Sequence, residues 1–271
     1  MTEPGLQLRL LDGQLQPSGV PSRAELLGQG LFETLYWNGS TFPLLMQHEH
    51  RLKQSAEWLG YDADQVWSAF CSQWAAHGKS ACDGMQAMVR FQWTHQQTAR
   101  GYGSSAGPAV TLWQVSQTTA DPVQTLDRLV LAARPMPDNP GPPCKHSSRV
   151  DQVVAAREGG SDQLRCDQHG FLREGLSGNL VFWRHGHWYT PGLQRHGVAG
   201  TLLAWLCQHW ADQDQPVLSG DFPPRILHSA EVVLLTNALG ARVVNDFEGV
   251  RYNRAHPVLQ TTLQTIRQLY S

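Results

Sequence analysis

The segment GPPCKHSSRVDQVVAAREGG, residues 141–160, passes from a proline-rich loop into a helix within a few residues. We expect this helix at about residues 149–158, with Ser148 as its candidate N-cap, because a serine oxygen can accept hydrogen bonds from the first turn. Lys145 stands just before the helix. The chain has two other lysines, Lys53 and Lys79. Since arginine carries most of the positive charge, Lys145 is a candidate for a chemical role.

The composition limits the classes of partner. A chain of 271 residues can form one large domain or two small ones, each with its own core. The formal net charge is -2 and the sequence pI is about 6.6. A nearly neutral surface does not attract nucleic acid or an anionic membrane. The expected partner is therefore a small molecule.

Cysteine usage and hydropathy point to one compartment. The five cysteines are scattered and form no Cys-x-x-Cys pair, which argues against a disulfide framework and a thiolate zinc site. No apolar run approaches the roughly 18 residues of a membrane span. The start, MTEPGLQLRLL, lacks the basic and apolar stretches of a secretory signal. We expect a cytoplasmic protein.

The first part of the chain predicts mixed structure. Asn38 and Gly39 separate two apolar runs, which is typical of a β-hairpin turn. Apolar residues at helical spacing predict a helix over 45–59 that ends at Gly60. The remaining elements expected here are a helix within residues 64–78 and strands within residues 84–93 and 109–116.

The second part predicts further strands and helices. Proline and polar residues indicate a connector at 117–124, between a smaller domain, 1–116, and a larger one, 125–271. The elements expected after the connector are a buried strand at 128–133, hairpins at 163–175 and 179–191, a helix at 200–213, a strand at 230–239 and a helix after Pro257. The pattern predicts an α+β protein in two parts with mixed sheets.

Seven motifs follow one another along the chain. They are GQGLFETLYWNG (28–39), HEHRLKQSAEWLG (48–60), ARGYG (99–103), KHSSRVDQV (145–153), REGLSGNLVFW (173–183), TPGLQRHGVAG (190–200) and EVVLLTNAL (231–239). In order and spacing they resemble the class IV aminotransferase family, whose members use pyridoxal 5'-phosphate (PLP). The resemblance implies the two-domain fold-type IV architecture, with a smaller N-terminal α/β domain and a larger C-terminal domain with mixed sheets.

The resemblance assigns roles to three residues. It implies that Lys145 forms a Schiff base with PLP, which requires a deprotonated amine and hence a lowered pKa. Glu174 matches the family acid that pairs with the pyridine nitrogen and keeps the ring protonated. Arg51 matches the family arginine that binds the cofactor phosphate, for which a guanidinium fork is well suited.

Further phosphate contacts are implied near a helix start and a strand end. The backbone amides of Val198 and Ala199 precede a predicted helix, and helix N-termini favour anions. Asn237 falls at the other family phosphate position, and Thr236 beside it is a close competitor. A metal site is not expected, because His48 and His50, two residues apart on a helix, point to different sides.

At positions where the branches of this family differ, the residues of this chain resemble those of the aminodeoxychorismate lyases. Phe32 stands where the aminotransferases carry tyrosine, and the KHSSRVDQV motif resembles the lyase form, including His146 and Arg149. Ser148, where the family usually has asparagine, and Ala199, where aminotransferases often have a hydroxyl residue, leave the substrate less certain. The predicted substrate-binding residues are Phe32, Arg100, Tyr102 and Ser177.

The implied reaction converts 4-amino-4-deoxychorismate into 4-aminobenzoate, the folate precursor, and pyruvate. An aminotransferase of the D-amino-acid or branched-chain type remains the first alternative, and a non-catalytic ligand-binding relative the second. The resemblance also implies a homodimer with the active site near its interface.

Overall fold

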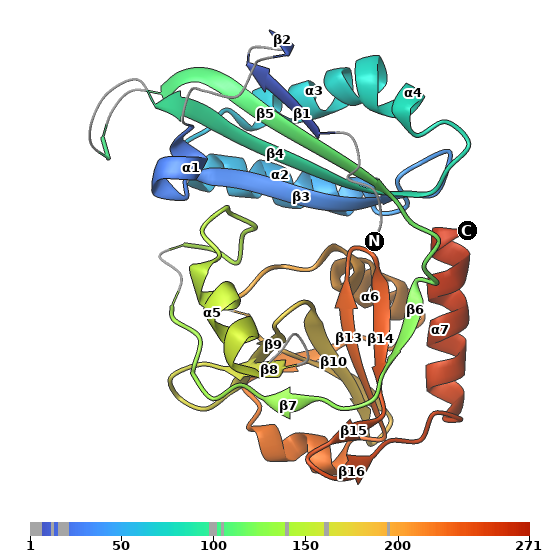
Figure 1. Ribbon diagram of the computed structural model, residues 1–271. Coiled ribbons are helices and arrows are strands. Elements are labelled where there is room, and N and C mark those ends of the chain that lie inside the picture. Colours follow the sequence, from blue (N-terminus) through green and yellow to red (C-terminus); the bar gives the residue numbers. More distant parts are fainter. Residues whose placement is uncertain are drawn as a thin grey trace. The chain divides into compact units, whose positions relative to one another are not determined.

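The computed structural model describes residues 7–11, 14–15, 22–97, 102–103, 106–138, 141–159, 163–193 and 196–271 (Figure 1). The chain forms two compact units. Unit 1 contains Met1–Thr119 and Cys144–Arg149, and unit 2 contains Ala120–Pro143 and Val150–Ser271. The Cys144–Arg149 segment, which the sequence placed in the larger domain, packs with unit 1 because it forms backbone hydrogen bonds there.

Unit 1 is built on a five-stranded antiparallel sheet of order β2-β1-β5-β4-β3. Its strands are β1 (Gln7–Leu11), β2 (Gln14–Leu15), β3 (Gly30–Trp37), β4 (Ala87–Gln97) and β5 (Ala106–Gln117). Its helices are α1 (Arg23–Leu27), α2 (Leu45–Trp58), α3 (Ala63–Gln73), the π-helical turn η1 (Trp74–Gly78) and α4 (Lys79–Ala81). The predicted helices and the two predicted strands are confirmed, and Gly60 ends α2 with a left-handed φ of 75°.

Alternation along the strands separates the two faces of the unit 1 sheet. Leu31 of β3 and Phe91 of β4 are fully buried in a core that includes Leu52 of α2 and Phe70 of α3. Because successive side chains of a strand point to opposite faces, the residues between these core positions face away from the helices. Figure 1 shows α2 and α3 along one side of β3 and β4.

The predicted hairpin at Asn38 and Gly39 is wrong. The turn leads from β3 into α2, and β3 pairs instead with β4, which begins after α2, α3, η1 and α4. The Asn38 side-chain oxygen accepts hydrogen bonds from the backbone N–H groups of Ser40 (3.0 Å) and Thr41 (2.8 Å). The dipeptide therefore forms a turn, but long-range packing decides which strand pairs with β3.

Unit 2 is built on a mixed six-stranded sheet of order β12-β11-β10-β13-β14-β6. Pairs β11–β12 and β14–β6 are parallel and the others antiparallel. The strands are β6 (Val123–Leu126), β10 (Asn179–Arg184), β11 (His187–Pro191), β12 (Leu218–Gly220), β13 (Val232–Asn237) and β14 (Gly240–Val244). A second mixed sheet contains β7 (Val130–Leu131), β8 (Gln163–Cys166) and β9 (Leu172–Gly175), and a two-stranded sheet contains β15 (Asp246–Phe247) and β16 (Val250–Arg251).

The helices of unit 2 are α5 (Val150–Gly159), α6 (Thr201–Ala211), the 3-10 helix η2 (Pro224–Ser229) and α7 (Pro257–Tyr270). The α7 helix contacts β6 and β14, as Figure 1 shows. The predicted hairpins β8–β9 and β10–β11 are confirmed, whereas the strand expected at 128–133 is reduced to β7. Within the described residues, no helix has both the length and the apolar composition needed to cross a membrane.

Candidate active site

The Lys145 segment extends the unit 1 sheet at the free edge of β3. The N–H of Phe32 donates to the carbonyl of Lys145 at 3.0 Å, and the N–H of Ser147 donates to the carbonyl of Gly30 at 2.8 Å. Leu31 and His146 form an antiparallel bridge between the same two segments. These bonds fix the backbone of Lys145.

Two glycines of the GQG sequence permit this close approach. Gly28 has a φ of 67°, and a Cβ added there would lie 2.9 Å from Cβ of Ser148. A Cβ at Gly30 would lie 2.7 Å from Oγ of Ser147. Neither position has room for a side chain unless the lysine segment moves. The first motif therefore shapes the surface on which Lys145 is placed.

Three cationic side chains surround the Phe32 ring. The amine of Lys145 lies 4.9 Å from the ring centroid, and the guanidinium carbons of Arg90 and Arg149 lie at 3.9 and 5.6 Å. Arg149 also donates to the carbonyl of His146 at 3.0 Å, which holds the lysine loop. Arg90 forms no hydrogen bond or ion pair within the part of the chain that the structure describes. This cluster suits a ligand that carries carboxylates.

A buried carboxylate, imidazole and guanidinium lie on the helix side of β3. Glu33 accepts from Nε of Arg51 at 2.8 Å, pairs also with Nη2 of Arg51, and contacts Nδ1 of His48 at 2.7 Å. Burial opposes ionisation of Glu33, but Arg51 and His48 outweigh it and hold the pKa of this carboxyl well below its usual range. Burial lowers the pKa of His48 below its ordinary value despite the attraction of Glu33.

The amine of Lys145 is tuned for chemistry near neutral pH. Burial lowers its pKa from 10.5 to about 7, assisted by Arg51, Arg149 and Arg90, while Glu33 acts in the opposite direction. A large fraction of the amine is therefore neutral at pH 7 and can attack a carbonyl carbon or accept a proton. This outcome agrees with the requirement inferred from the sequence.

In unit 2, a loop wraps around the carboxylate of Glu174. Glu174 lies on β9, is 6% exposed, and accepts a hydrogen bond from the N–H of Val198 at 3.0 Å. Gly197 has a φ of 67°, and a Cβ there would lie 2.5 Å from the carboxylate. Glycine is therefore required where the loop passes this acid.

The predicted phosphate contacts are only partly available. The N–H of Val198 is bound by Glu174, and the N–H of Ala199 donates to the carbonyl of Pro143 at 2.9 Å. Asn237 stabilises its own turn, because it donates to the carbonyl of Ser177 at 3.0 Å and accepts from Leu239. Both amides and the Asn237 side chain are therefore engaged by the protein in this structure.

Two threonines at the ends of elements offer hydroxyl groups. Thr236 is fully buried at the end of β13, and its hydroxyl lies 3.5 Å from the carbonyl of Asn179. Thr201, which the sequence analysis missed, is the first residue of α6 and is 1% exposed. Its hydroxyl has no hydrogen-bond partner among the described residues. An unpaired buried hydroxyl at a helix start suits a phosphate group.

The predicted substrate residues differ in their surroundings. Phe32 contacts the Lys145 amine, but Tyr102 is 86% exposed and Ser177 is exposed, with its hydroxyl bonded to Arg242 at 2.5 Å. Arg100 lies outside the described residues. The sequence analysis missed Arg90, although a charged residue inside the alternating run MVRFQW marks the sheet face opposite the core.

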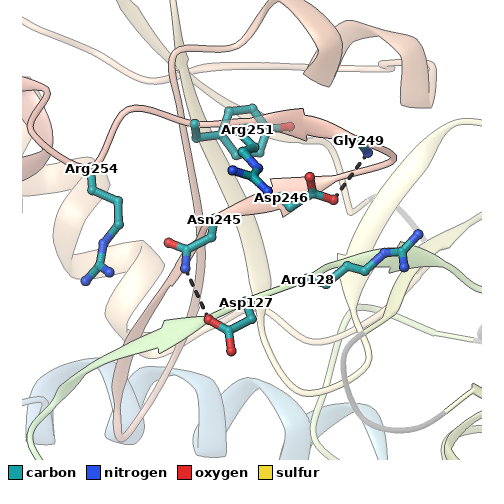
Figure 2. A pocket seen from close by; sticks show the side chains of 8 residues that line it. Asp127, Arg128, Asn245, Asp246, Gly249, Arg251 and Arg254 are labelled. Carbon is teal, nitrogen blue, oxygen red and sulfur yellow. Dashed lines mark hydrogen bonds between the residues drawn. The ribbon is translucent and has the colours of Figure 1, made fainter.

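Unit 2 also has a surface pocket of about 580 Å³ (Figure 2). Figure 2 shows Asp127 within hydrogen-bonding distance of Asn245, at 3.2 Å, and Asp246 bonded to the N–H of Gly249, at 3.2 Å. None of the site residues predicted from the sequence lines this pocket. The volume of a cavity alone thus does not identify the reactive groups.

Comparisons with known proteins identify relatives of the chain. The family model for Amino-transferase class IV matches residues 30–245. A Schizosaccharomyces pombe protein named "Putative aminodeoxychorismate lyase" is 30% identical over 176 residues, which cover 60% of this chain and 67% of that protein.

Solved structures match almost the whole chain. The 4-amino-4-deoxychorismate lyase of Pseudomonas aeruginosa has a TM-score of 0.84 at 25% identity, covering 97% of this chain and 98% of the lyase. A branched-chain aminotransferase of Thermoproteus uzoniensis, solved with norvaline, has a TM-score of 0.80 at 18% identity. The match covers 98% of this chain and 95% of the aminotransferase. A hypothetical aminotransferase of Mycobacterium tuberculosis in its PLP-bound form has a TM-score of 0.77 at 20% identity. The match covers 97% of this chain and 98% of that protein. These matches confirm the predicted fold class.

Proposed function

Since the chain belongs to the class IV aminotransferase family, it is an enzyme, and we propose that it is a PLP-dependent lyase that converts 4-amino-4-deoxychorismate into 4-aminobenzoate and pyruvate. The observation that carries this proposal is the cluster of Lys145, Arg90 and Arg149 around the Phe32 ring. The proposed substrate has a six-membered ring and two carboxylates, which match an aromatic surface flanked by guanidinium groups. The likeness to lyases in two organisms supports the same choice.

Four side chains of the chain have the chemistry that PLP requires. Lys145 supplies an amine that is partly neutral at pH 7, and Glu174 supplies a buried carboxylate for the ring nitrogen. Arg51 supplies a guanidinium for the phosphate, and Thr201 supplies a buried hydroxyl that has no partner among the described residues. These side chains are chemically complementary to the aldehyde, the pyridine nitrogen and the phosphate of PLP.

When bound, PLP supplies an electron sink for the electron pair left by removal of a proton from the amine-bearing carbon. Lys145 removes that proton, for which a pKa of about 7 is well matched at neutral pH. Glu174 favours a proton on the ring nitrogen, and Arg90 and Arg149 orient the carboxylates of the substrate.

The lyase reaction needs no second substrate, because 4-aminobenzoate and pyruvate together contain all the atoms of 4-amino-4-deoxychorismate. An aminotransferase requires a keto acid to regenerate its cofactor. The test is therefore to supply the purified protein and PLP with 4-amino-4-deoxychorismate and no keto acid. We expect equal and continuing release of pyruvate and 4-aminobenzoate.

A matched reaction with D- and L-amino acids and 2-oxoglutarate tests the alternative. Amino transfer without pyruvate release in the first assay would overturn the lyase and favour an aminotransferase. Borohydride reduction followed by peptide mass spectrometry should place the PLP label on Lys145. A label on Lys53 or Lys79 would contradict the site as well as the reaction.

A further inference from the structure

Glu33 binds the side chains of His48 and Arg51 on the helix side of β3. One of its oxygens accepts from Nε of Arg51 at 2.8 Å, and the other binds Nη2 of Arg51 and Nδ1 of His48, the latter at 2.7 Å. Glu33 is 2% exposed, His48 is 1% exposed and Arg51 is 5% exposed. Water therefore cannot replace any of these bonds, and the fork allows the Arg51 guanidinium one orientation.

We propose that Glu33 is a positioning residue of the Lys145 site, where it fixes the guanidinium of Arg51 and offsets part of the positive charge that Arg51 exerts on the lysine amine. This inference rests on the proposed function only in taking Lys145 as the reactive amine and Arg51 as a cofactor-binding group. It assigns Glu33 no contact with substrate or PLP.

The charged groups around Lys145 determine the direction in which its pKa should shift in each variant. Arg51, Arg149 and Arg90 all favour the neutral amine, whereas Glu33 alone among the groups that act strongly on it favours the ammonium form. His48 contributes a contact of 2.7 Å between its Nδ1 and Glu33, and burial lowers its pKa. Loss of the Glu33 charge should therefore make Lys145 more acidic, and loss of the Arg51 charge should make it less acidic.

Competitive labelling can measure this effect without turnover. The full-length protein, without added PLP, is treated with an amine-acylating reagent across pH 5–9, and labelling is read by peptide mass spectrometry. Lys53 and Lys79 are the only other lysines and serve as internal references. In Glu33→Gln, labelling of Lys145 at pH 6 should rise roughly fivefold, because removal of a nearby opposite charge lowers such a pKa by about one unit, and a fall from about 7 to about 6 raises the neutral fraction at pH 6 from roughly a tenth to about a half. In Arg51→Gln, it should fall.

A purely structural role would not move the two variants in opposite directions. Glu33→Asp keeps the charge, so its labelling profile should stay close to that of the natural protein. Its shorter side chain cannot reach Arg51 and His48 together, so PLP retention, measured by cofactor fluorescence during dialysis, should weaken. The Asp variant thus provides a test even if Glu33→Gln does not fold.

Asp167→Asn provides the matched control. Asp167 is a buried carboxylate that forks with Arg173, at 3.0 Å to Nε and 2.5 Å to Nη2, but it belongs to unit 2 and is not among the groups that act on Lys145. Its labelling profile at Lys145 should be unchanged. Equal profiles for Glu33→Gln and the natural protein, or shifts in one direction for Glu33→Gln and Arg51→Gln, would overturn the proposal, as would unchanged PLP retention in Glu33→Asp. Failure of the proposed lyase reaction would appear only in the pyruvate assay.

Discussion

Lys145 and Phe32 are joined twice, through a backbone hydrogen bond of 3.0 Å and through an amine that lies 4.9 Å from the ring centroid. The first contact fixes the backbone position from which the Lys145 side chain extends. The second places the end of its side chain among the guanidiniums of Arg90 and Arg149. A fixed backbone position and an amine at the end of a long side chain fit the role that we propose for Lys145.

Lys145→Ala should abolish lyase turnover and leave the fold intact. The substitution removes the amine, while the backbone bonds to Phe32 and Gly30 remain possible because they involve main-chain atoms only. Pyruvate release measures the activity, and circular dichroism measures the fold. Lys53→Ala is the control, because Lys53 pairs with Glu49 and Asp64 on the surface of unit 1. Turnover at the natural rate in Lys145→Ala would refute the central assignment.

Much of the fold is predictable because its elements are strongly periodic. The pattern identified α2, α3 and β4 from local spacing and side-chain alternation. The prediction was wrong at Asn38, where a local turn signal led us to expect that the two segments flanking the turn pair with each other. The true partner of β3 is β4, and no local rule reveals a pairing across the intervening helices α2, α3, η1 and α4.

The sequence predicts a site residue where one motif contains it. Lys145 and Glu174 were predicted in this way and stay predictions, whereas Arg90 was not predicted because strand periodicity identifies the core face and ignores the opposite one. Glu33 was missed because His48 and Arg51 lie 15 and 18 residues away along the chain. Only the packing of α2 against β3 brings these three together.

Gly28→Ala should damage the Lys145 site more than Gly84→Ala. Both glycines have nearly the same left-handed φ, 67° and 68°, so alanine should cause a similar backbone strain at each position. A Cβ at Gly28 meets Cβ of Ser148 at 2.9 Å, whereas a Cβ at Gly84 meets nothing within 4 Å. We expect an additional loss of about 1–3 kcal/mol in the free energy of unfolding for Gly28→Ala.

The same comparison has a chemical readout. Displacement of the lysine segment should slow the appearance of Schiff-base absorbance when PLP is added to Gly28→Ala, but not when it is added to Gly84→Ala. Equal stabilities and equal rates in the two variants would show that the GQG sequence does not position Lys145.

Arg90→Gln should weaken use of the dicarboxylate substrate. Arg90 lies 3.9 Å over the Phe32 ring and forms no ion pair within the described residues, so its charge is available to a ligand. Loss of a charged hydrogen bond costs about 1.5–3 kcal/mol, which corresponds to roughly 10- to 100-fold in kcat/KM. Steady-state pyruvate release gives this ratio. Exposed Arg128→Gln is the control, and an equal effect in both variants would remove Arg90 from the substrate site.

Lys145→Met should stabilise the PLP-free protein most at low pH. The pKa of Lys145 is lowered from 10.5 to about 7 on folding, so the unfolded chain binds more protons than the folded chain between these values. The natural protein therefore gains stability from this group as pH rises from about 7 toward 10.5. At pH 6 the folded state must bury the ammonium group, and its destabilising effect is fully present.

Methionine fills a similar volume without a charge. When the variant and the natural protein are compared at one pH, the contributions of the other titrating groups to the free energy of unfolding therefore cancel. The stabilisation by Lys145→Met, from urea unfolding, should be up to a few kcal/mol at pH 6 and smaller by about 1–3 kcal/mol at pH 9. Lys79→Met, at an exposed position, should show the same small difference at both pH values. A stabilisation by Lys145→Met that does not change between pH 6 and pH 9 would mean that Lys145 keeps an ordinary pKa in the folded protein, and that its amine must be activated by the cofactor and not by Arg51, Arg90 and Arg149.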